Sequence, residues 1–256
     1  MRSFILVALC ICLGSDVVFA QQQDEVFHYS TMEAMRNAVY SGNMAIGEIK
    51  DKGDFGLGTY NLLDGELIAL DGVFYRVASN GKIEQASPER QIPFASVTFF
   101  QQDTLIALSN VKDFEELQNA ISQALPSANH FYAIRIHLTF DTVVTGGASR
   151  VKPHETKGIA EFMPSRPLYK TSQKTGTIIG FYCPPFIGGV DLSPFHFHFI
   201  SDDRTYGGHL ISGSFKANAK IEVQLDEKED YKIVLPSVQN EGYQQKWKKM
   251  EAQKSY

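Results

Sequence analysis

The feature that most constrains this chain is a short run in which histidine alternates with phenylalanine, Phe195-His196-Phe197-His198-Phe199. Its aromatic content is typical of a β-strand, in which successive side chains point to opposite faces. We therefore expect His196 and His198 to share one face and the phenylalanines to form a core face. Gly207-Gly208-His209 follows across a polar segment that predicts a hairpin, which would bring His209 beside the other two.

Three neutral imidazoles with an open fourth position are the ligand set expected of a catalytic zinc or a similar divalent ion. The alternative is that His196 and His198 line a polar sheet face while His209 lies in a loop. A His-x-His pair alone is common in purely structural roles. The third histidine across a predicted hairpin favours the metal site.

Residues 1–20 have the pattern of a cleaved secretory signal peptide, with Arg2, an apolar stretch from Phe4 to Leu13, and small residues before the predicted cleavage site. The apolar stretch is too short to span a bilayer, so no membrane association is expected after cleavage. Export to a periplasm or to the medium is predicted.

Only Cys183 lies outside this segment, which leaves no internal disulfide. The net charge of −5 argues against a nucleic-acid partner.

The remaining pattern predicts an α+β (α/β) fold of mixed or antiparallel sheet with a few short helices. Helical spacing follows a capping box at residues 30–33 and recurs at 113–125, while residues 132–140 alternate as a half-buried strand. Residues 141–175 are expected to form a long irregular connection. The mature chain is divided into an N-terminal mixed-sheet part, about 21–140, and a C-terminal β part, about 141–256, that carries the histidines.

Several blocks resemble the alpha-acetolactate decarboxylases, and they occur in the family's order from about Thr31 to Pro236. A set of ordered blocks is far more specific than any single one. The blocks are Gly-Asp-Phe-Gly-Leu-Gly-Thr at 53–59, Leu-Asp-Gly-Glu-Leu-Ile-Ala-Leu-Asp-Gly at 63–72, Tyr-Ala-Ile-Arg-Ile at 132–136, Gly-Thr-Ile-Ile-Gly-Phe at 176–181, and the histidine segments at 195–200 and 207–209.

This resemblance implies a zinc-dependent carboxy-lyase that converts 2-acetolactate to acetoin and carbon dioxide through a metal-stabilised enediolate. It also implies two β-rich subdomains with the metal between them, and a homodimer. The family's metal ligands fall on His196, His198 and His209. Other divalent metals remain possible at such a site, because imidazole binds several of them. No organic cofactor is expected.

The resemblance also places the family's other active-site residues. Its glutamate falls on Glu66 and its threonine on Thr59, while its arginine falls on Arg150, after an apparent Gly146-Gly147 insertion. Its C-terminal glutamate falls on Glu251, with Glu241 a poorer candidate. An arginine would orient the substrate carboxylate, and Glu66 and Glu251 are the candidates for proton delivery.

Two other functions fit the same residues. A secreted zinc hydrolase would use three histidines and a glutamate with metal-bound water as the nucleophile. A non-catalytic exported protein that binds metal or carbohydrate would leave Glu66 and Arg150 without a role.

Overall fold

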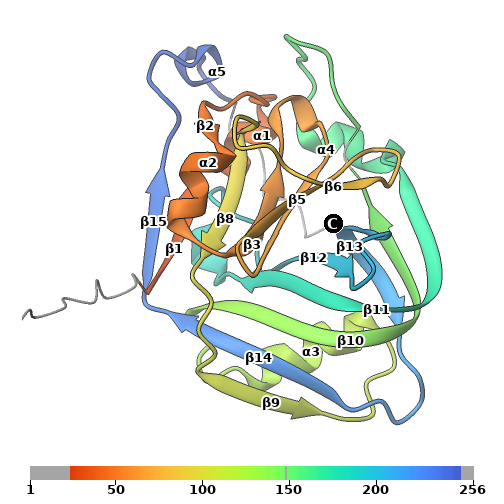
Figure 1. Ribbon diagram of the computed structural model, residues 1–256. Helices are drawn as coiled ribbons and strands as arrows, with labels where there is room; N and C mark the ends of the chain where they lie inside the picture. The colour runs from red at the N-terminus through yellow and green to blue at the C-terminus, as the bar shows by residue number, and fades with distance from the viewer. Residues whose placement is uncertain (1–23, 148, 249–256) are drawn as a thin grey trace, which may run out of the picture.

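The computed structural model describes residues 24–147 and 149–248. Two β-sheets pack face to face, with short helices at their edges and outer faces (Figure 1). The first sheet has seven strands in the order β15-β1-β8-β3-β4-β5-β6, and the second has six in the order β11-β12-β13-β10-β14-β9. All pairings are antiparallel except that of β1 with β15. The predicted fold class, sheet-rich with a few short helices, is therefore confirmed.

The elements of the first sheet are β1 (Glu25–Tyr29), β3 (Phe55–Thr59), β4 (Glu66–Leu70), β5 (Val73–Val77), β6 (Ile83–Gln85), β8 (Phe94–Thr98) and β15 (Asp230–Val234). Those of the second are β9 (Thr104–Leu108), β10 (Phe131–Gly146), β11 (Leu168–Tyr182), β12 (Phe195–Ser201), β13 (Gly207–Ser214) and β14 (Ile221–Lys228). A small ribbon joins β2 (Met44–Ala45) to β7 (Gln91–Ile92). The helices are α1 (Met32–Arg36), α2 (Ile46–Ile49), α3 (Phe114–Ala124), α4 (Ile159–Phe162) and α5 (Glu241–Gln244).

Period-2 alternation decides which side chains meet between the two sheets. On β4, Ile68 and Leu70 pack into the cluster between the sheets, whereas Leu67 and Ala69 pack into the cluster on the outer face with α2. On β12, Ile200 enters the cluster between the sheets, and the phenylalanines pack on the opposite side against α3. Residues in phase with Ile68 or Ile200 therefore face the space between the sheets.

The longest strands depart from the sequence-based expectation. Residues 141–175 were expected to be irregular, but β10 continues to Gly146 and β11 already begins at Leu168. The two strands pair along their whole length, from Tyr132 opposite Tyr182 to Gly146 opposite Leu168. Alternating polar and β-branched residues sustain both ladders in spite of the glycines. The irregular connection is therefore limited to residues 147–167. It leaves β10 and enters β11 at neighbouring positions, because Gly146 pairs with Leu168.

The predicted division near residue 140 does not coincide with the change of sheet. The chain enters the second sheet at β9, β10 runs through residue 140, and β15 returns to the first sheet. The first helix is capped one residue later than the predicted box at 30–33, because the Thr31 hydroxyl accepts from the Ala34 N–H. Asp113 caps α3, at the start of the second predicted helix. The predicted signal peptide lies outside the described residues.

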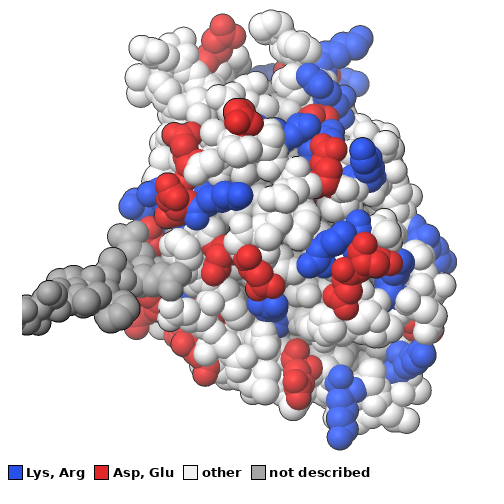
Figure 2. All heavy atoms as spheres, in the orientation of Figure 1, with Lys and Arg blue, Asp and Glu red and all other residues white. Residues whose placement is uncertain are grey.

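Charged side chains of both signs are interspersed over the face seen in Figure 2. Within the ranges 24–147 and 149–248, no helix is long and apolar enough to cross a membrane. Cys183 is buried.

Candidate metal centre and cavity

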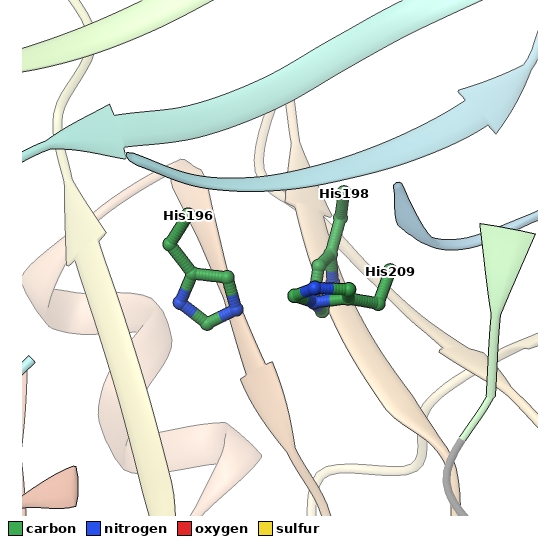
Figure 3. A group of neighbouring side chains, drawn as sticks. All are labelled: His196, His198 and His209. Carbon is green, nitrogen blue, oxygen red and sulfur yellow. The ribbon is translucent and has the colours of Figure 1, made fainter. Parts of the chain in front are cut away.

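The three histidines come together as the strand pattern predicts. His198 on β12 lies directly opposite His209 on β13, and His196 lies two residues along β12 on the same face. Their potential ligand nitrogens all lie within 4.8 Å of one another, and the three rings gather around one space (Figure 3). His196 is 6% exposed and His198 is 1% exposed. The hairpin and the shared face are both confirmed.

The environment of these rings suits a cation. Nδ1 of His198 lies 2.9 Å from the carbonyl oxygen of Leu67. A carbonyl only accepts, so Nδ1 carries the proton and Nε2 is left with a free lone pair. Burial, followed by His196 and His209, lowers the pKa of His198 well below its ordinary value. Burial, His196 and Arg166 do the same to the pKa of His209. Neutral buried imidazoles are the form that binds a divalent metal, so the donor set fits such an ion.

Glu66 and Thr59 lie opposite each other on β4 and β3, in phase with the residues that face the second sheet. The Glu66 carboxyl oxygen is 3.8 Å from Nε2 of His198. Burial raises the pKa of Glu66 to about 8, against the opposing influence of Arg166. The Thr59 hydroxyl donates to the carbonyl oxygen of Gly65 at 2.8 Å. In the metal-free chain Glu66 therefore holds a proton at neutral pH beside the histidines.

A cavity of about 90 Å³ joins these groups. Its polar lining includes Thr59, Glu66, His196 and His209, together with the two arginines Arg36 and Arg166. Its walls are otherwise largely apolar, formed by Met32, Met35, Leu63, Phe94, Ile159, Met163 and Leu192. A small, mostly apolar chamber with a few convergent polar groups is typical of a small-molecule site.

Comparison with known proteins places this arrangement in a family. The family model described as alpha-acetolactate decarboxylase matches residues 26–248. The chain belongs to the alpha-acetolactate decarboxylase family. The enzyme of that name from Bacillus licheniformis is 36% identical over 218 residues, covering 85% of this chain and 84% of the relative. The one from Bacillus subtilis strain 168 is 37% identical over 192 residues, covering 75% of this chain and 74% of the relative.

Solved structures agree with the sequence relatives. The crystal structure of alpha-acetolactate decarboxylase from Bacillus subtilis strain 168 superimposes with a TM-score of 0.78 at 34% identity, covering 84% of this chain and 91% of that one. The name that these relatives carry describes a carboxy-lyase acting on acetolactate. The resemblance seen in the sequence blocks is thereby confirmed.

In this member of the alpha-acetolactate decarboxylase family, the structure does not bring the predicted arginine to the cavity. Arg150 is exposed and is not among the residues that line the cavity, whereas Arg166 is half-buried and lines it. The reason is the strand register. Gly146 pairs with both Leu168 and His209, so the residues just before Leu168 lie beside the histidines.

Gly146 also leaves room for the Arg166 side chain. A Cβ atom at Gly146 would lie 3.3 Å from Cδ and Nε of Arg166. The glycine pair, which looked like an insertion, lines the cavity together with Arg166. Extending β10 and β11 to their full lengths from the sequence would have revealed this position.

Of the two C-terminal glutamates, only Glu241 lies within the described residues. Glu251 lies outside the described residues, so its predicted role stays a prediction. Glu241 is exposed at the start of α5 and is not among the residues that line the cavity. Among the described acidic residues, only Glu66 lines it.

Proposed function

We propose that this protein decarboxylates 2-acetolactate to acetoin and carbon dioxide, using a divalent metal held by His196, His198 and His209. One observation carries the proposal: in a chain of this family, a cluster of three imidazoles adjoins a cavity that is also lined by a buried glutamate and a half-buried arginine. A bound divalent cation would supply a Lewis acid that accepts electron density from the substrate's carbonyl and hydroxyl oxygens.

The reaction requires one bond to break and one proton to be delivered. As carbon dioxide leaves, the electron pair of the broken C–C bond moves toward the neighbouring carbonyl and gives an enediolate. A proton added to the carbon that bore the carboxylate then gives acetoin. Glu66 is proposed as the donor, because its carboxyl group lines the cavity beside the histidines and burial raises its pKa.

Arg166 is proposed to orient the substrate carboxylate before it leaves. A guanidinium group forms two parallel hydrogen bonds to a carboxylate, which fixes the scissile bond relative to the metal site. The second arginine of the cavity, Arg36, already lies 3.3 Å from the Glu33 carboxylate. Arg166 is therefore the better anchor, in place of Arg150.

Thr59 is proposed to accept a hydrogen bond from the substrate's hydroxyl group. Its own hydroxyl proton is directed to Gly65, which leaves the oxygen lone pairs available at the cavity wall. Glu251 remains a second candidate for handling the substrate hydroxyl.

Zinc is the proposed resident metal, because an all-imidazole set of three ligands with an open position suits it. We further propose that residues 1–20 direct export and are removed, and that the enzyme is a homodimer. The size of the protein in solution and the N-terminus of the secreted form test these two points.

The test of the function is acetoin formation from racemic 2-acetolactate by purified residues 21–256, without thiamine or nicotinamide cofactors. Acetoin and carbon dioxide should appear in equal amounts, and His198→Ala should fold, lose the metal and lose activity. Folded wild-type protein that binds zinc but forms no acetoin would overturn the proposal. Hydrolysis of ester or amide substrates by that protein would favour the zinc hydrolase instead.

A further inference from the structure

A second group of buried polar residues lies directly behind the histidine cluster. Asp191, in the connection between β11 and β12, is 2% exposed and is surrounded by side chains of the first sheet. Its Oδ2 accepts hydrogen bonds from Ser96 Oγ at 2.7 Å and from the Tyr231 hydroxyl at 3.0 Å. Its Oδ1 accepts from the backbone N–H of Leu192 at 2.7 Å. These three hydrogen bonds compensate for the burial of the Asp191 carboxylate and fix its orientation.

His28 completes the group and supplies a further donor. Its Nδ1 lies 2.8 Å from Ser96 Oγ and 2.9 Å from the Tyr231 hydroxyl. Both hydroxyl protons are already directed at Asp191, so Nδ1 of His28 must itself carry a proton and donate it. Although burial opposes ionisation of Asp191, His28 and then His196 lower its pKa well below the ordinary value.

This group is not a hydrolytic triad, in spite of its serine, histidine and aspartate. Ser96 and His28 are each 0% exposed, so no substrate reaches the serine. The serine proton is also directed at the carboxylate and not at the histidine. The cluster must therefore act through a neighbour.

The neighbour is His196. Its Nδ1 is buried and, within the described part of the chain, has no hydrogen-bond partner, and it lies 3.7 Å from Oδ1 of Asp191. Figure 3 shows the other ring nitrogen on the side of His198 and His209. A ring that binds a cation through Nε2 must carry its proton on Nδ1, and only a small shift would then close a hydrogen bond to Asp191.

We propose that Asp191 is the positioning residue of the metal site: it accepts the Nδ1 proton of His196, fixes Nε2 as the ligand atom, and is itself held by His28, Ser96 and Tyr231. This inference rests on the proposed metal site. It matches the role of the Leu67 carbonyl at His198, except that the acceptor is charged. A negative charge one imidazole away from a bound cation increases the affinity for that cation.

The test measures Co²⁺ binding to the metal-free protein by competition with a chromogenic chelator, together with the visible spectrum of bound Co²⁺. Asp191→Ala should weaken binding by about 100-fold and Asp191→Asn, which keeps an acceptor oxygen, by about 10-fold. Both should change the spectrum. The matched control is Asp226→Asn, which removes another buried carboxylate, 1% exposed and 2.8 Å from Lys228, that does not line the cavity.

The control variant should lose stability without losing Co²⁺ affinity. Wild-type affinity and spectrum in folded Asp191→Asn would overturn the inference while leaving the proposed function intact. Absence of Co²⁺ binding by the wild type would overturn both. If the Asp191 variants do not fold, Tyr231→Phe decides, since it keeps the carboxylate and removes one donor. A weakened affinity there supports the inference, and an unchanged affinity and spectrum overturn it.

Discussion

Replacing Glu66 with glutamine should remove a specific pH dependence from the stability of the metal-free protein. The pKa of this carboxyl group is raised by burial from 4.5 to about 8 in the folded chain. Between these two values the folded state binds a proton that the unfolded state has lost, so stability falls as pH rises. The contribution is fully present below pH 4.5 and is lost as pH rises through about 8. Each pH unit within this window costs ~1.4 kcal/mol.

From pH 5 to pH 7.5 the wild type should therefore lose ~3 kcal/mol of unfolding free energy relative to Glu66→Gln. This is an upper value, because the side chain is still 13% exposed. The assay is urea unfolding of both metal-free proteins at several pH values. Glu241→Gln, at an exposed carboxylate, should follow the wild type. Parallel curves for wild type and Glu66→Gln would refute the view that Glu66 is held protonated.

The remaining predictions concern the cavity and its walls. Arg166→Ala should lower kcat/KM for acetolactate by about 10- to 100-fold, because a charge-assisted hydrogen bond to the substrate is lost. Arg150→Ala should keep wild-type kinetics. The reverse result would restore Arg150 as the anchor. Thr59→Val should lower kcat/KM by about 10-fold with little loss of metal. Steady-state kinetics and metal analysis test this, and an unchanged kcat/KM or a large loss of metal would contradict it. Gly58→Ala should destabilise the fold by about 1–3 kcal/mol, because the added Cβ would lie 2.3 Å from the Phe94 carbonyl oxygen. Gly47→Ala in α2 should not destabilise the fold, because its Cβ would make only ordinary contacts. Equal melting temperatures for the two variants would contradict this packing argument.

The histidine cluster was predictable because it depends only on local rules. Alternation along one strand places His196 and His198 together, and a glycine-ended hairpin returns His209 to them. Thr59 and Glu66 were assigned through the family resemblance, and the structure places them opposite each other on neighbouring strands.

Arg166 and Asp191 were not predicted, because each depends on distant pairings. Arg166 reaches the cavity only because β10 and β11 stay in register over their full length. Asp191 lies in a connection, and its partners come from β1, β8 and β15, which are far apart in the sequence. Neither residue carries a local pattern that marks it.

The most direct test of the proposed metal-dependent decarboxylation is reconstitution of the metal-free enzyme. The protein is stripped with a chelator, zinc is added back in steps, and bound zinc and the rate of acetoin formation are measured at each step. Activity should be absent at the start and rise in proportion to bound zinc until about one ion per chain is reached. Full acetoin formation by protein shown to contain no metal would contradict it.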